Sequence, residues 1–241
     1  MSKRRAIVYI DGFNLYFGLK ASVMPDALSG TELGMTRREL KKRYPLTKRS
    51  YWLDIQKLAT TIIRDADLET VKYFTARITG NHNKQLRQNA FLNAIQVYCP
   101  KLKIFEGRYL LRRVLCSKCR KYNDLFVCPS CQHANVHPEE KKSDVNIATQ
   151  MLLDAYENRC DIAYLVSGDS DFVPPIKAIR SMNSPKVVAV AFPPKQGRSK
   201  ELQESATFSF PIPTNMIKKS WLPDRIPKPD RTFITIPQEW Q

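Results

Sequence analysis

The sequence predicts an α/β domain with a mainly parallel central β-sheet and helices on both faces of that sheet. The first observation is a set of short apolar runs rich in β-branched residues, such as residues 6–10, which are typical of strands buried on both faces. The second is that segments with apolar residues at helical spacing separate these runs, and residues 53–64 are an example. Strands that alternate with helices indicate a parallel sheet, because a crossover helix must return the chain to the start of the next strand.

The first half of the chain begins with a strand at residues 6–10, followed by a turn, Asp11-Gly-Phe-Asn14, from which Leu15 opens a helix. Residues 21–50 are expected to be a basic loop with one short helix, a length that favours a functional insertion. The next expected elements are a helix at 53–64, a strand at 71–78, a helix at 85–98 and a short strand at 102–105.

The same rhythm resumes after a cysteine-bearing segment at residues 108–138. The expected elements there are a helix at 144–156, a strand at 162–166, a helix at 172–182, a strand at 186–192 and a short helix at 199–206. Eight of the sixteen prolines fall in the last 49 residues, so the tail beyond about residue 211 is expected to be extended or partly disordered. We therefore expect a domain over 5–210, an insert at 108–138 within it and a proline-rich C-terminal extension at 211–241.

The chain is strongly basic, with 39 Lys and Arg against 23 Asp and Glu and a formal net charge of +16. Such an imbalance attracts polyanions, of which nucleic acid is the commonest in the cytosol, although charge can also serve solubility alone. Clustering favours nucleic acid, because residues 37–49 contain seven basic residues and a single acid. The expected contacts in this run are Arg37, Arg38, Lys41, Lys42 and Arg43.

Three aromatic residues accompany this basic run: Tyr44, Tyr51 and Trp52. Their rings could stack on bases, or they could belong to the core beside the following helix. For Trp52 we favour the core.

Four of the six cysteines form two pairs, Cys116-Ser-Lys-Cys119 and Cys128-Pro-Ser-Cys131, separated by eight residues. In a chain that we expect to be cytosolic, such pairs favour a metal site over disulfides. Four thiolates complete a closed tetrahedral Zn²⁺ site, so its expected role is structural. A segment of about thirty residues cannot bury a core of its own, and the metal would supply its folding energy.

The cysteine-bearing insert at residues 108–138 is also basic. We expect it to contact nucleic acid through Arg112, Arg113, Lys118, Arg120 and Lys121. The alternatives are a stabilising element, or a module that docks a protein partner or a second copy of the chain. Cys99 and Cys160 are isolated in the sequence and are expected to be small buried residues.

Acidic residues follow two of the expected strands directly. Asp11 comes after residues 6–10, and Asp169 and Asp171 come after residues 162–166, while Asp144 begins a helix. Ligands bind outside the carboxyl ends of parallel strands, so these side chains are expected to converge. Each aspartate taken alone could instead be a turn residue or a helix cap. Converging carboxylates repel one another unless a hard cation such as Mg²⁺ or Mn²⁺ neutralises them.

Three segments resemble the motifs of NYN domains, a branch of the PIN-like nucleases. They are Ile7-Val-Tyr-Ile-Asp11-Gly-Phe-Asn14-Leu15, Lys141-Lys-Ser-Asp144-Val145 and Leu165-Val-Ser-Gly-Asp169-Ser-Asp171-Phe172, in the order found in the family. The third is the most specific. The resemblance covers roughly residues 5–210, apart from the cysteine-bearing insert.

This resemblance implies a three-layer α/β/α, PIN-like (Rossmann-like) fold and cleavage of RNA that depends on Mg²⁺ or Mn²⁺. It implies that Asp11, Asp144, Asp169 and Asp171 are catalytic metal-site residues, supported by Asn14. Ser167 and Gly168 would shape the turn, with Gly168 allowing close approach of the backbone.

The function expected from the sequence is therefore a metal-dependent endoribonuclease that hydrolyses phosphodiester bonds. One alternative is a catalytically weak nucleic-acid-binding or adaptor protein with the same fold and zinc insert. Another is a nuclease that acts on DNA, because phosphate chemistry does not distinguish the two sugars. No apolar run is long enough to span a membrane, and the short N-terminal apolar run lacks the features of a signal peptide, so we expect a cytoplasmic protein.

Overall fold

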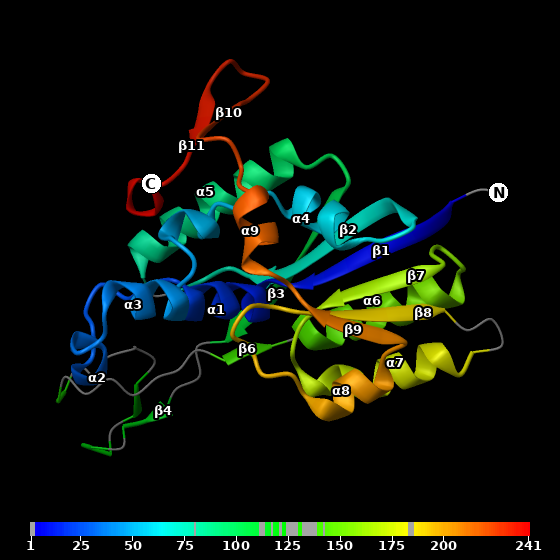
Figure 1. Cartoon of the computed structure of the whole chain (residues 1–241), viewed down its shortest axis with the longest axis horizontal. Helices are drawn as coiled ribbons and strands as arrows, with labels where there is room; N and C mark the ends of the chain where they lie inside the picture. Colours follow the sequence, from blue (N-terminus) through cyan, green and yellow to red (C-terminus); the bar gives the residue numbers. More distant parts are fainter. Residues whose placement is uncertain are drawn as a thin grey trace.

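The computed structural model describes most of the chain and shows an α/β domain (Figure 1). The described residues are 3–79, 81–110, 114–116, 118–120, 122–123, 130–131, 139–141, 143–182 and 186–241. Within them, no helix is both long and apolar enough to cross a membrane.

A seven-stranded sheet lies at the centre, in the order β6-β3-β2-β1-β7-β8-β9. Neighbouring strands from β3 to β9 run parallel, and β6 pairs antiparallel with β3 at one edge. The expected mainly parallel sheet is thus confirmed. Its strands are β1 (Arg4–Asp11), β2 (Ala66–Ala76), β3 (Leu102–Leu110), β6 (Glu139–Lys141), β7 (Ile162–Val166), β8 (Val187–Phe192) and β9 (Phe208–Pro211).

The order of the strands reverses direction at β1. The chain passes from β1 to β2 and β3 on one side, and then crosses to β7, β8 and β9 on the other. In open α/β sheets the crevice at such a reversal, outside the carboxyl ends of the strands, is where ligands bind. Here β1 ends at Asp11, and β7 ends at Val166, just before the turn that contains Asp169 and Asp171. The first and third motifs therefore lie at this crevice.

Helices cover both faces of the sheet (Figure 1). One face of the sheet is covered by helices whose buried residues belong to the first core cluster: α1 (Gly12–Ser22), α4 (Ile55–Ile62), α5 (His82–Tyr98) and α9 (Thr214–Lys219). Those on the other are α6 (Ser143–Tyr156), α7 (Val173–Arg180) and α8 (Lys200–Ser205). The strand β1 serves both layers, because Val8 and Ile10 point into the first core cluster and Ile7 and Tyr9 into the second.

The expected basic loop at residues 21–50 is largely helical. It contains α2 (Gly30–Leu33), α3 (Arg37–Arg43) and the 3-10 helix η1 (Lys48–Tyr51). The signals for these helices are in the sequence, because Ser29 with Glu32 and Thr36 with Glu39 each form a capping box. We expected only one short helix here, because neither α2 nor α3 carries an apolar stripe of the usual length.

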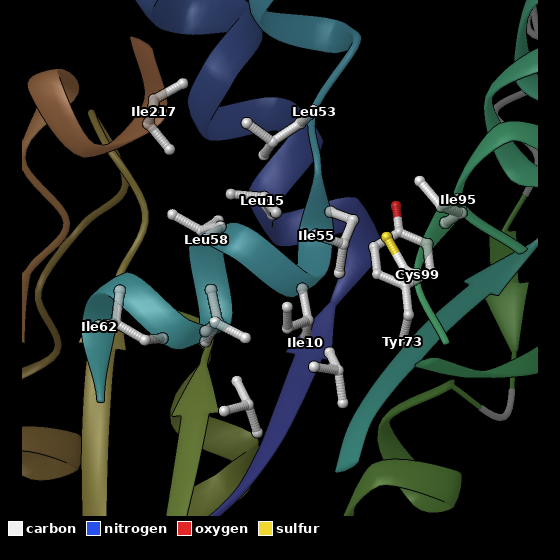
Figure 2. Packing of buried hydrophobic residues seen from close by; sticks show 14 of the residues in the cluster. Ile10, Leu15, Leu53, Ile55, Leu58, Ile62, Tyr73, Ile95, Cys99 and Ile217 are labelled. Carbon is white, nitrogen blue, oxygen red and sulfur yellow. The ribbon is translucent and has the colours of Figure 1, made fainter. Parts of the chain in front are cut away.

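The expectation of an extended or partly disordered tail is wrong. Residues 211–241 include α9, the hairpin β10 (Arg225–Pro227) and β11 (Phe233–Thr235), and the 3-10 helix η3 (Gln238–Trp240). Ile212, Ile217, Leu222, Ile226 and Ile236 are buried in the main core. Ile217 lies beside Leu53 and Leu58 (Figure 2), so the tail completes the packing around α4. Prolines prevent long regular elements but do not prevent apolar side chains between them from being buried.

Trp52 is fully buried, which confirms that it belongs to the core. Cys99 and Cys160 are buried as expected, at 2% and 1% exposure. Tyr51 is partly buried and packs against the same core.

Candidate metal-dependent active site

Asp11 stands at the junction of β1 and α1, where it caps the helix. Its Oδ1 accepts a hydrogen bond from the backbone N–H of Asn14 at 2.9 Å, as is typical of a capping aspartate. Its Oδ2 accepts one from the hydroxyl of Ser167 at 3.1 Å. The side chain is therefore fixed at both oxygens, in a residue that is only 6% exposed.

The turn after β7 is tied to this junction by further hydrogen bonds. Oδ1 of Asn14 accepts a bond from the backbone N–H of Gly168 at 3.0 Å. The Ser167 hydroxyl accepts one from the N–H of Asp169 at 3.2 Å, and Oδ1 of Asp169 accepts one from the N–H of Asp171 at 3.0 Å. We expected Ser167 only to shape the turn, but its hydroxyl links the two motifs directly.

Asp144 lies in the first turn of α6 and completes the group. One carboxylate oxygen from each of Asp144, Asp169 and Asp171 lies within 4.8 Å of the other two. Asp11, Asn14, Asp144 and Asp169 also line one pocket of about 300 Å³, while Asp171 lines the neighbouring hollow. The structure therefore gathers all five predicted residues at one place, with Asp11 beside the cluster of three.

The electrostatics of this pocket reflect its crowding with carboxylates. Burial raises the pKa of Asp11 to about 6, and the charges of Asp144 and Asp169 add to the increase, against the hydrogen bonds from Asn14 and Ser167. Burial also raises the pKa of Asp144, together with the charges of Asp169 and Asp171. A hard divalent cation prefers such oxygen ligands and offsets their repulsion, so these residues fit a metal of this kind.

Without metal, Asp11 is expected to destabilise the folded protein at neutral pH. Its pKa in the folded protein, about 6, exceeds the usual value of 3.8, so the folded state favours the protonated carboxyl group. The stabilisation that protonation of Asp11 gives is complete below about pH 4 and is lost as the pH rises through 6. Asp11→Asn removes this effect and should raise the free energy of unfolding in EDTA at pH 8 by roughly 2–3 kcal/mol. The measurement is urea denaturation at pH 8 and pH 4. A gain that is equally large at pH 4 would contradict this explanation.

Three pocket residues were not predicted: Phe13, Phe17 and Gln196. Gln196 belongs to the loop after β8, which approaches two glycines closely. A Cβ on Gly168 would lie 2.8 Å from the carbonyl oxygen of Gly197, and one on Gly18 would lie 2.6 Å from that of Pro194. Gly168 does allow a close approach, as expected from the resemblance, but Gln196 itself lies in no motif.

The cysteine insert is described only in part. The Sγ atoms of Cys116, Cys119 and Cys131 lie within 4.8 Å of one another, and Cys128 lies outside the described residues. Burial of Cys116 opposes ionisation, but hydrogen bonds from the N–H groups of Cys119 and Lys118 and from the neighbouring thiols lower its pKa to about 6. A thiol that ionises readily is suited to binding a metal.

The predicted basic contacts of residues 37–43 all lie on α3 and are exposed. The chain after α3 joins the C-terminal end of α1, where the N–H of Leu46 donates to the carbonyl of Ser22 at 3.0 Å. This basic helix is thus linked to the end of α1 opposite Asp11. Lys118 and Arg120 are exposed on the insert, whereas Arg112, Arg113 and Lys121 lie outside the described residues.

The fold and the pocket together define an α/β protein with an acidic centre at the carboxyl edge of its sheet. The chain belongs to the NYN domain family, whose model matches residues 5–212. This confirms the resemblance seen in the sequence motifs.

The chain is similar to individual proteins, among which are the following two. One is the 6-hydroxy-3-succinoylpyridine 3-monooxygenase HspA of Pseudomonas putida, which is 25% identical over an alignment of 219 residues that covers 81% of this chain. The alignment spans 62% of the length of HspA, so the chain covers less than two thirds of this relative. The other is a crystal structure of a protein of unknown function from Vibrio parahaemolyticus, with 16% identity and a TM-score of 0.47, covering 91% of this chain and 97% of that one.

Proposed function

We propose that the protein is a metal-dependent endoribonuclease that hydrolyses phosphodiester bonds in the acidic pocket. The observation that carries this proposal is the cluster of Asp144, Asp169 and Asp171 beside the buried Asp11, in a chain of the NYN family. A concentration of carboxylates would repel a phosphodiester, so the cluster is suited to nucleic acid only when a cation is held there.

Each residue has a distinct role in this proposal. Asp144, Asp169 and Asp171 would hold Mg²⁺ or Mn²⁺, which supplies an activated water and neutralises charge on the phosphate. Asp11, which is buried, completes the set of oxygens, and Asn14 and Ser167 hold its carboxylate in place. The net charge of +16, including the exposed α3, would attract the substrate backbone.

Two other functions are less well supported. A nucleic-acid-binding or adaptor protein would need the basic surface but not a complete set of four aspartates. The name of the Pseudomonas relative describes oxidation of a pyridine compound. The described lining of the pocket offers carboxylate and amide oxygens and no histidine, which suits hard cations better than an oxygen-activating iron site.

The direct test is an assay of the purified chain on single-stranded RNA and on DNA of the same sequence. We expect RNA to be cleaved internally with Mn²⁺ or Mg²⁺, and left intact with EDTA. Binding of RNA without cleavage under any of these metals would instead support the adaptor function, and cleavage of DNA alone would make the protein a deoxyribonuclease.

We also propose that the cysteine cluster binds one structural Zn²⁺, with Cys128 as its fourth ligand. Chain purified without chelators should contain about one zinc per molecule by elemental analysis, because four thiolates form a closed site. Replacing Cys116 and Cys119 by serine together should remove the zinc and make the insert sensitive to protease. Cys160→Ala changes a cysteine outside the cluster and should leave the zinc content unchanged. Wild-type protein without zinc would refute the assignment.

A further inference from the structure

Two aromatic rings, those of Phe13 and Phe17, line the same pocket as Asp11, Asp144 and Asp169. They lie four residues apart on α1, so they share one face of the helix, and their centroids are 6.5 Å apart. Phe17 is 51% exposed, although a phenyl ring is favoured in the interior. Tyr16 beside it is also exposed, and adjoining exposed apolar side chains, unlike scattered single ones, can mark a binding site.

These two rings contribute to neither core cluster, but they are connected through Tyr16 to two rings that pack against the core. Phe17 contacts Tyr16 at a centroid distance of 5.5 Å, and Tyr16 contacts Tyr51 at 5.5 Å. Tyr51 in turn contacts Trp240 of the C-terminal segment at 5.6 Å, and both pack against the main core. The aromatic run is therefore anchored in the core at one end and exposed at the pocket at the other, which holds Phe17 in position.

We propose that Phe13 and Phe17 form a stacking site for an unpaired base of single-stranded RNA, next to the phosphate that is bound at the aspartates. This inference rests on the proposed function and specifies its substrate. Aromatic side chains stack on bases of any identity, but only when the base is free of its neighbours and its pairing partner. A duplex offers no such face, so the site selects single strands.

A further residue of the pocket lining supports this assignment by its chemistry. Gln196 lines the pocket and carries both a donor and an acceptor for a base edge. Lys195 and Arg198 are exposed in the same loop, and their charges suit the phosphates on either side of a stacked base. Rings and an amide thus share the pocket with the carboxylates, and cations lie on either side of Gln196 in the sequence, which is a combination that suits a ribonucleotide unit.

The experiment measures binding separately from cleavage. Fluorescence anisotropy of labelled RNA of about 12 nucleotides, single-stranded or annealed to its complement, is recorded with full-length Asp169→Asn protein in Mg²⁺ and with wild type in Ca²⁺, so that a hard cation offsets the charge of the carboxylates. Phe17→Ala is added to each, with Phe17→Trp as the conservative variant. Tyr156→Ala is the matched control, because Tyr156 is an exposed ring (82%) at the last position of α6.

Phe17→Ala should weaken binding of the single strand by about 5- to 100-fold and leave the weaker binding of the duplex unchanged. Phe17→Trp and Tyr156→Ala should stay within about threefold of their parent, because a stacking face is retained or was never involved. Equal binding of the single strand by Phe17→Ala and its parent, or no binding of single-stranded RNA at all, would overturn the stacking site. If Phe17→Ala loses affinity while wild type cleaves no RNA with Mn²⁺, the proposed function fails and the stacking site stands.

Discussion

Replacing Asp169 by asparagine is expected to lower Mn²⁺-dependent cleavage of RNA by at least about 100-fold, without loss of the fold. A metal ligand contributes several kcal/mol of transition-state stabilisation, and each 1.4 kcal/mol is a factor of ten in rate. The asparagine retains the side-chain oxygen that accepts the N–H of Asp171 at 3.0 Å, so the turn should persist. The measurement is the initial rate of cleavage over a range of Mn²⁺ concentrations.

The matched control for this variant is Glu201→Gln. Glu201 is an exposed acid that lines the hollow next to the pocket together with Asp171, but it lies outside the cluster of three carboxylates. The Glu201→Gln variant makes the same change of charge at nearly the same place. Its rate of RNA cleavage should stay within a few fold of the wild-type rate. Full activity of Asp169→Asn, or equal loss in both variants, would show that the cluster is not the catalytic centre.

Replacing Asp154 by alanine is expected to lower the free energy of unfolding by about 3–5 kcal/mol. Asp154 is fully buried. Its Oδ2 accepts hydrogen bonds from the hydroxyl of Tyr9 and from the ammonium group of Lys72, each at 2.6 Å. Lys72 is only 4% exposed. In the Asp154→Ala variant its ammonium group would remain as a buried charge without the carboxylate of Asp154. Urea denaturation of the variant and the wild type measures the difference.

A double variant separates the cost of the unpaired charge from the loss of packing. Lys72→Met combined with Asp154→Leu replaces the buried pair by apolar side chains and should be less destabilised than Asp154→Ala alone. The matched surface control is Asp161→Asn, because Asp161 pairs with Arg5 at 3.1 Å with side chains that are 36% and 40% exposed. It should cost about 1 kcal/mol or less. If Asp154→Ala costs no more than this control, Lys72 is not held as a buried charge.

The parts of the fold that the sequence predicted correctly depend on local patterns. The strand at residues 162–166 has the bounds that its apolar run predicts, and the helix expected at 144–156 begins one residue earlier, at Ser143. The strand is a continuous apolar run that is buried on both faces, whereas the helix repeats its apolar residues at the helical period. The convergence of Asp11 and Asp169 followed from the carboxyl ends of parallel strands, which meet at one edge, whereas the place of Asp144 was expected mainly from the family resemblance.

The sequence by itself therefore determined the parallel sheet, the NYN family and the aspartates of the acidic site. Tertiary structure alone decided that the proline-rich tail is part of the core, because burial of Ile217 depends on α4, which lies far away in the sequence. It also decided that Gln196 reaches the pocket, where its loop packs against glycines of two other segments. Phe13 and Phe17 could have been core residues by their type, and only the packing of the remaining chain left them facing the aspartates. Local periodicity specifies which element forms, whereas the surroundings of a side chain depend on residues distant in the sequence.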